Sequence, residues 1–449
     1  MKKYRSFSIF FLLLALTAAL AAPAAAAEPF SVEATAAILL DADYNEVLYE
    51  QAADERRYPA SITKVMTGLL TVEAIDRGEL SMDTVVTLGD DLYTGIGEGG
   101  STQGLKSGEI LTVQDLLYCA LLPSANEACN ALASAVAGSI PAFVELMNQR
   151  AAALGMTNTH FVNTHGYHDD AHYTTARDIA KMCAEAMKHP DFREIVSSVR
   201  YDVPATNLHA ARELHDTNAL VSNFRTGRSD LLYRYAVGIK TGSTPEAGFC
   251  LASAAEKNDR LMIAVLLGGQ DYRKAEANYF SESKRLLEYG FNEFSRKELL
   301  SPIDPIATVP VKYCAQQDYV TVQASLGLEA TLPNDLDPTL FLRQVELPES
   351  LEAPIEKGQV LGSISISYAG KDYGSADLIA TTALERSQLV FILDHIQALF
   401  SLLWVKLLLL AAILLLLLLV LRRMVFGPSR RKRYNAPKTY SASYRGRKR

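Results

Sequence analysis

The sequence is poor in cysteine. Its 449 residues include five cysteines, which lie far apart along the chain: Cys119, Cys129, Cys183, Cys250 and Cys314. An odd number without close pairing predicts buried thiols rather than a disulfide framework. No C-x-x-C or comparable spacing is present, which excludes the common zinc-binding patterns. We therefore expect neither a disulfide-stabilised domain nor a cysteine-bound metal.

Acidic residues are missing from the N-terminal end, which is apolar. Lys2, Lys3 and Arg5 precede an apolar run over 7–20, and a small-residue tract over 21–27 offers an A-x-A cleavage site. This arrangement predicts a secretory signal peptide over 1–27 that is cut near Ala27. An uncleaved N-terminal anchor is the alternative.

The C-terminal end also lacks acidic residues. Lys406 is the single charge within 402–421, a run long enough to cross roughly 30 Å of hydrocarbon as a helix, with Trp404 at an interfacial position. The following segment, 422–449, has eleven Lys or Arg and no acidic residue. Nucleic-acid binding is the alternative for such a tail, but a basic run directly after an apolar span favours orientation by the positive-inside rule or contact with anionic lipid. We expect a cell-membrane protein with one C-terminal span, an extracytoplasmic ectodomain and a cytoplasmic tail.

Without its ends, the chain is strongly acidic. Residues 28–401 contain 29 basic and 51 acidic residues, a net charge of −22, whereas the whole chain has −7. A surface of this sign does not bind nucleic acid by bulk charge. Any anionic substrate must therefore be held by local cations.

The ectodomain changes in composition near Pro302. Residues 28–298 combine a β-hairpin around 43–45, helical spacing over 61–80, 113–122, 126–136 and 281–294, and strands over 235–240, 248–256 and 260–267. This mixture predicts an α/β layer domain. Short β-like runs between turn signals predict a small all-β domain over 299–382, and 383–401 is expected to be a helical or linking juxtamembrane segment. No repeat of fixed period is present.

A serine lies three residues before a lysine at Ser61 and Lys64, directly after Pro59-Ala60 at an expected helix start. One helical turn places the two side chains on the same face, and the helix N-terminus favours a developing oxyanion. The spacing alone is weak, because Ser281 and Lys284 repeat it. Taken by itself, Ser61 would be interpreted as an N-cap.

Two further strings strengthen the interpretation. Ser124-Ala125-Asn126 follows Pro123 at a break between two expected helices, and Lys240-Thr241-Gly242 stands at the end of an expected strand. Each could be an ordinary turn or cap. Together, in this order, they supply a nucleophile, a base, a proton-relaying hydroxyl and a cationic strand edge, which are the parts that serine acyl transfer needs without a histidine.

With these strings, the chain resembles the serine-type D-alanyl-D-alanine carboxypeptidases, low-molecular-mass penicillin-binding proteins of the serine β-lactamase-like superfamily. The likeness covers nearly the whole ectodomain and includes these segments: 59–64, Ser124-Ala125-Asn126-Glu127, His165-Gly166, 173–178, 240–244 and 357–362. It implies a β-lactamase/transpeptidase-like domain, an antiparallel sheet flanked by helices, followed by a small all-β domain.

The resemblance also implies roles. Ser61 would attack the penultimate D-alanine of a peptidoglycan stem peptide, or a β-lactam, and Lys64 would accept its proton; burial and the charge of Lys240 would lower the pKa of Lys64. Ser124 would relay a proton to the leaving amine, and Asn126 would orient Lys64 and the substrate. The terminal carboxylate would be held by Lys240 and Thr241, with Arg273 or Lys274 as a further candidate, while Gly242 would let the substrate approach. The backbone N–H groups of Ser61 and Ser243 would form the oxyanion hole.

Other functions compete with this one. A β-lactamase would be expected to carry a deacylating glutamate, yet 146–184 contains none, and the middle position of Ser124-Ala125-Asn126 lacks the usual aspartate. A catalytically silent penicillin- or wall-binding receptor would be expected to have lost a catalytic position, and none is missing. The cluster of His165, His168, Asp169, Asp170 and His172 could suggest a metal, but the serine site needs none. Transpeptidation or endopeptidation by the same acyl-enzyme stays open.

Overall fold

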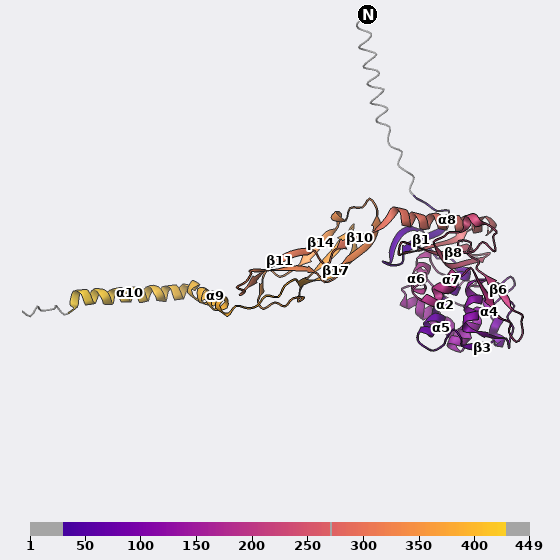
Figure 1. Cartoon of the computed structure of the whole chain (residues 1–449), viewed down its shortest axis with the longest axis horizontal. Helices are drawn as coiled ribbons and strands as arrows, with labels where there is room; N and C mark the ends of the chain where they lie inside the picture. Colours follow the sequence, from indigo (N-terminus) through magenta and orange to yellow (C-terminus); the bar gives the residue numbers. More distant parts are fainter. Residues whose placement is uncertain (1–29, 270–271, 428–449) are drawn as a thin grey trace, which may run out of the picture. The chain divides into compact units, whose positions relative to one another are not determined.

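The structure, a computed structural model, describes residues 30–269 and 272–427. The expected signal peptide and residues 428–449 of the expected tail lie outside the described residues. The chain forms two compact units (Figure 1). The first ends at Lys297 and also includes Glu329–Asp337, and the second holds Glu298–Leu328 and the chain from Pro338 onward.

A five-stranded antiparallel sheet is the centre of the first unit, with strand order β2-β1-β9-β8-β7. Its strands are β1 (Ala36–Asp41), β2 (Glu46–Gln51), β7 (Ala236–Thr244), β8 (Gly248–Lys257) and β9 (Arg260–Gly269). The predicted N-terminal hairpin is confirmed as β1 and β2. Since β7 is the last strand in this order, one of its edges is left without a strand neighbour in the described chain.

Helices cover both faces of this sheet (Figure 1). The helices of this unit are η1 (Ala60–Thr63), α2 (Lys64–Asp76), α3 (Val113–Leu121), α4 (Asn126–Ala137), α5 (Ile140–Ala153), α6 (Ala176–Ala186), α7 (Pro190–Ser197) and α8 (Tyr272–Glu293). Alternation along β1 explains the two faces: Ile38 and Leu40 join the core with α2 and α6, while Ala37 and Leu39 join the core with α8. Short elements border this unit: β3 (Val85–Thr87), η2 (Asp90–Tyr93), β4 (Ile110–Thr112), β5 (Arg200–Val203), β6 (Arg212–His215) and η3 (Ser229–Leu231).

Two expectations near the site need correction. The helix expected over 61–80 begins as the 3₁₀ turn η1 and its α-helical part ends at Asp76, because Gly78 takes a left-handed conformation that stops it (φ 72°). The strand expected over 235–240 continues to Thr244. Lys240 and Gly242 therefore lie inside an edge strand rather than after its end.

The second unit is built on a six-stranded sheet with strand order β14-β16-β17-β12-β11-β15. Its strands are β11 (Pro305–Lys312), β12 (Tyr319–Ala324), β14 (Leu342–Glu346), β15 (Leu351–Glu352), β16 (Val360–Tyr368) and β17 (Lys371–Ala380), with η4 (Pro338–Leu340) before β14. A separate two-stranded sheet pairs β10 (Phe294–Leu300) with β13 (Leu328–Pro333).

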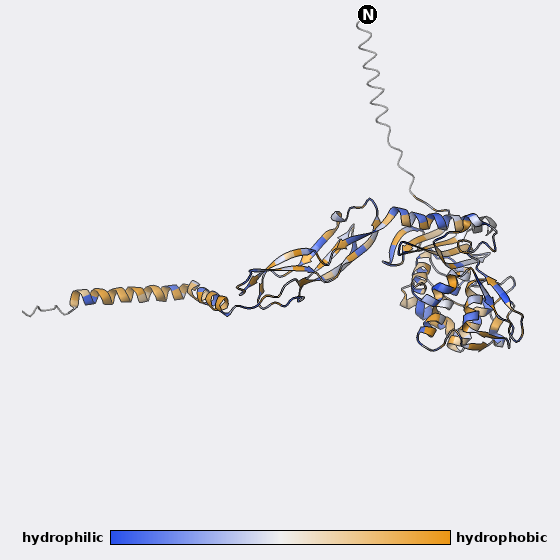
Figure 2. Ribbon diagram, viewed as in Figure 1, coloured by the Kyte–Doolittle hydropathy of each residue, from blue (hydrophilic) through white to orange (hydrophobic). Residues whose placement is uncertain are grey.

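The chain ends in two apolar helices, α9 (Gln388–Ser401) and α10 (Leu403–Phe426), separated at Leu402. Figure 2 shows hydrophobic residues around nearly all of α10. This helix has 24 residues and a mean hydropathy of 3.0 over its most apolar window, which suits a membrane span. It begins one residue later than the expected 402–421 and continues five residues beyond it.

Candidate active site

Ser61 and Lys64 are brought together at the start of the helical layer. Ser61 lies in η1, and Lys64 is the first residue of α2. The Lys64 Nζ donates to Ser61 Oγ at 2.8 Å and to the backbone oxygen of His165 at 2.8 Å. These two contacts aim the amine at the hydroxyl.

The environment of Lys64 disfavours its charged form. The side chain is fully buried, and burial lowers the pKa of Lys64 to about 8, against smaller opposing effects from Cys129 and Glu127. A substantial share of the amine is therefore neutral near pH 8. Only a neutral amine can accept the Ser61 proton.

Ser124 and Asn126 lie at the break between α3 and α4. Ser124 has a left-handed backbone (φ 72°), a conformation that costs a non-glycine residue about 1–3 kcal/mol and occurs most often at functional sites. Its Oγ is buried and makes no hydrogen bond to any described group. Asn126 is held by its backbone N–H, which donates to Ser101 O at 2.9 Å. The Ser124 hydroxyl is therefore able to hydrogen-bond to a ligand in the cleft.

Six of the predicted residues line one cleft, whereas Lys64 and Lys240 are buried and do not line it. Its cavity volume is about 860 Å³, and its lining includes Ser61, Ser124, Asn126, Thr241, Gly242 and Ser243. Gly242 is the point of closest approach between β7 and η1: a Cβ there would lie 3.0 Å from the backbone N of Ser61. The edge of β7 and the Ser61 amide therefore border the same space.

Lys240 is a buried lysine of β7, next to Thr241 of the cleft lining. It is 1% exposed, and its Nζ donates to Thr241 O at 3.1 Å. Burial, followed by the nearby charge of Lys64, lowers the pKa of Lys240 to about 7, whereas Asp216 opposes that shift. Burial raises the pKa of Asp216 to about 7. The positive charges of Lys64 and Lys240 repel each other, so the state in which both amines are protonated is disfavoured.

Three residues near the cleft were not predicted. Thr217 and Arg225 line it, Thr217 Oγ1 lies 2.7 Å from Thr241 Oγ1, and Asp216 is buried close enough to influence Lys240. All three come from the irregular segment between β6 and β7, where no spacing marks them. Arg225 thus places a guanidinium group in the lining of the cleft. Arg273 lies in the first turn of α8, and its side chain is outside the described residues.

The histidine cluster surrounds and supports the serine site. His172 Nε2 lies 2.8 Å from Thr63 Oγ1, and His165 supplies the oxygen that receives Lys64. Burial lowers the pKa values of His165 and His172 to about 3, so both rings are neutral. His168 lines the cleft beside Gly166 and Tyr167. Thr175 caps α6, since its Oγ1 accepts from the N–H of Asp178 at 3.1 Å.

The second serine–lysine copy has a different setting. Ser281 and Lys284 lie in α8, and Lys284 Nζ donates to Leu232 O at 3.2 Å. Neither residue lines the cleft that contains Ser61.

Comparisons with known proteins match this geometry. The family model described as D-alanyl-D-alanine carboxypeptidase matches residues 22–271, and the model described as penicillin-binding protein 5, C-terminal domain, matches 294–386. The D-alanyl-D-alanine carboxypeptidase DacA of Escherichia coli is 32% identical over 374 residues, which cover 82% of this chain and 88% of that protein. DacF of Bacillus subtilis is 29% identical over 363 residues, covering 81% of this chain and 89% of that protein.

A solved structure extends the likeness to the fold. Penicillin-binding protein 5 from Haemophilus influenzae superposes with a TM-score of 0.63 at 28% identity, covering 80% of this chain and all of that one. On the strength of the family match over 22–271 and the DacA identity, this chain belongs to the D-alanyl-D-alanine carboxypeptidase family.

Proposed function

We propose that this protein is a serine D-alanyl-D-alanine carboxypeptidase that trims the terminal D-alanine from peptidoglycan stem peptides and is acylated by penicillins. The observation that carries the proposal is the hydrogen bond between buried Lys64 and Ser61, in a cleft also lined by Ser124 and the β7 edge. Family membership supports the same chemistry.

The first half-reaction makes an ester. Neutral Lys64 takes the Ser61 proton as Ser61 Oγ bonds to the carbonyl carbon of the penultimate D-alanine. The backbone N–H groups of Ser61 and Ser243 stabilise the oxyanion. The peptide C–N bond then breaks, Ser124 relays a proton to the leaving D-alanine amine, and Asn126 orients Lys64 and the substrate amide.

Charge around the cleft accounts for carboxylate binding. Lys240, Thr241 and Arg225 surround the position where the terminal carboxylate would lie, which meets the need for local cations in an ectodomain of net charge −22. Water then attacks the ester carbonyl, releases the shortened peptide and restores Ser61.

The apolar C-terminal helix supports a membrane location. We propose that α10 spans the cell membrane once, with the catalytic unit outside and 428–449 inside, after export by the N-terminal signal peptide. The length and apolarity of α10 support this topology, as do the basic residues that follow it.

The test uses the full-length protein in detergent with a D-Ala-D-Ala peptide and, separately, a fluorescent penicillin. We expect D-alanine release and a long-lived adduct on Ser61. Ser61→Ala should remove the adduct and reduce D-alanine release by on the order of 10⁴-fold or more. Ser281→Ala is the matched control, because it alters the other serine–lysine copy.

Two results would contradict the proposal. An adduct that persists in Ser61→Ala would place the nucleophile elsewhere. Rapid penicillin turnover without D-alanine release would indicate a β-lactamase instead.

A further inference from the structure

A second cavity adjoins the cleft, on the side where β7 turns into β8. Its volume is about 840 Å³, and we call it the arginine pocket after Arg56 and Arg57, which line it together with Tyr173, Thr244 and Glu246. Thr244 and Glu246 line both this pocket and the cleft. The two cavities therefore meet at the β7–β8 turn.

The order of groups along β7 gives the direction of a bound peptide. Under the proposed function, the terminal carboxylate lies at Lys240 and the reacting carbonyl at Ser243. A peptide extended along the open edge of β7 then directs its upstream residues past Thr244 to Glu246. At about 3.3 Å per residue, one to three strand positions beyond Ser243 correspond to about 3–10 Å. The arginine pocket begins within this reach.

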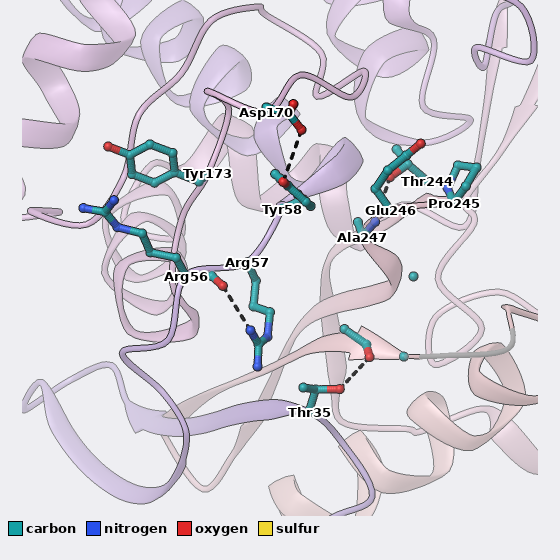
Figure 3. Close-up of a pocket in the computed structure, with 13 residues that line it drawn as sticks. Thr35, Arg56, Arg57, Tyr58, Asp170, Tyr173, Thr244, Pro245, Glu246 and Ala247 are labelled. Atoms are coloured by element: carbon teal, nitrogen blue, oxygen red, sulfur yellow. Dashed lines mark hydrogen bonds between the residues drawn. The ribbon is translucent and has the colours of Figure 1, made fainter.

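The positive charge of the pocket comes from Arg56 and Arg57, which lie across it from Thr244 and Glu246. Arg56 lies over the Tyr173 ring, 4.4 Å from its centroid, and forms no ion pair with the described residues. Arg57 pairs with Glu55, but its Nε is buried without a hydrogen-bond partner in the described chain. Figure 3 shows Arg56 beside Tyr173 and Arg57 extending toward Thr35, across the pocket from Thr244 and Glu246. Two guanidinium groups facing one cavity in an acidic ectodomain suit an anionic group of the ligand.

One acidic residue of the pocket also lines the cleft: Glu246 borders both cavities. Asp170 lines the pocket alone, where its Oδ1 accepts from Tyr58 OH at 3.4 Å and lies 3.4 Å from His168 Nε2. A peptide leaving the cleft therefore meets negative charge first and the arginines afterwards. This order matches a stem peptide with a cationic residue next to the acylating D-alanine and a carboxylate one residue further upstream.

We propose that the arginine pocket binds a carboxylate of the stem peptide two residues upstream of the penultimate D-alanine, so that the enzyme prefers acidic stems over amidated ones. The inference rests on the proposed carboxypeptidase function. It names a specificity site that is separate from the reacting groups: Arg56 and Arg57 bind the upstream part of the substrate, and Ser61 and Lys64 perform the reaction.

The test compares two peptides that differ by one group. Both end in L-Lys-D-Ala-D-Ala, preceded either by γ-linked D-glutamate with a free α-carboxylate or by its α-amide. For the full-length wild type, we expect KM to be about three- to fivefold lower for the carboxylate peptide, the effect of a partly solvated charge pair, with similar kcat. The double variant Arg56→Gln/Arg57→Gln should raise KM for the carboxylate peptide to that of the amide.

The controls separate specificity from folding. Arg200→Gln removes an exposed arginine that lines neither cavity and should keep the wild-type preference. The acylation rate by benzylpenicillin, which has no upstream carboxylate, shows whether the double variant keeps a folded cleft. Equal KM values for the two peptides in the wild type, or an equal rise for both in the double variant, would overturn the pocket assignment. If the wild type released D-alanine from neither peptide, the proposed function itself would be overturned.

Discussion

At the scale of single residues, two buried lysines determine the chemistry of the cleft. Lys64 and Lys240 are both nearly inaccessible, and the charge of Lys64 contributes to the lowered pKa of Lys240. Burial is the strongest effect on both side chains, and it lowers the pKa of Lys64 to about 8 and that of Lys240 to about 7. Asp216 favours the charged form of Lys240 but does not raise its pKa above that of Lys64. A carboxylate bound beside Lys240 would favour the charged form of that amine.

The lowered pKa of Lys64 predicts a pH dependence. Only the deprotonated amine accepts a proton, so the second-order rate constant of penicillin acylation should rise with pH and reach half its maximum near pH 8, where Lys64 titrates in the free enzyme. Stopped-flow acylation from pH 6 to 9.5 would measure it. Lys64→Arg, which stays charged, should show no such rise and only residual acylation. A flat wild-type profile would contradict the role of Lys64.

Gly242 predicts a second effect at the residue scale. An added Cβ would approach the backbone N of Ser61 at 3.0 Å and that of Ile62 at 3.1 Å, so η1 and β7 must separate by a few tenths of an ångström. We expect Gly242→Ala to slow acylation by about tenfold, since small misplacements of reacting groups cost rate steeply. The melting temperature, measured in parallel, should change little. Unchanged acylation would show that the approach of β7 to Ser61 is not needed.

At the scale of elements, helix ends place the catalytic groups. The 3₁₀ turn η1 precedes α2, the break between α3 and α4 presents Ser124, and α6 packs against α2 and the sheet. The α6 N-terminus is capped by Thr175, which is completely buried. The layer behind Ser61 therefore depends on a local hydrogen bond as well as on apolar packing.

Removing this cap should reduce stability without changing the chemistry. Thr175→Ala leaves the N–H of Asp178 without its acceptor and should cost about 1 kcal/mol, or about 2–4 °C in melting temperature for a domain of this size. Thermal unfolding and penicillin acylation would be compared with Thr157→Ala, an exposed threonine in the preceding segment. An unchanged melting temperature would show that the cap contributes little.

At the scale of the whole molecule, α10 is the feature that supports a membrane location. Its residues are exposed around the entire helix, which in a water-soluble chain would leave a large apolar surface uncovered. A membrane removes this cost.

This topology can be tested in intact cells. A tag after Arg449 should resist external protease, because we place the tail in the cytoplasm, whereas a tag inserted just before Ser387, after β17, should be cleaved. Detergent permeabilisation should expose the first tag and serves as the control. Loss of the C-terminal tag before permeabilisation would rule out the proposed orientation.

Much of the architecture could be predicted because its signals are local. The hairpin of β1 and β2 follows from two β-prone runs around a turn, and the apolar run of α10 is visible without any partner. The start of α4 follows from the break at Pro123. Strand ends were harder to predict. β7 extends past Gly242 because 241–244 pair with 248–251 of β8, and no feature within 235–240 indicates that pairing.

The sequence by itself determined the chemical groups and their order: a serine one helical turn before a lysine, a second serine at a helix break, a lysine–threonine–glycine strand edge and an apolar C-terminal helix. These depend on side-chain type and short spacing. The family resemblance already implied a lowered pKa for Lys64. Tertiary structure alone decided that Ser281 has no place in the cleft, and that Asp216, Thr217 and Arg225 lie near the β7 edge. Burial, electrostatic fields and contacts between distant segments arise only when the layers pack together, so no local pattern encodes them.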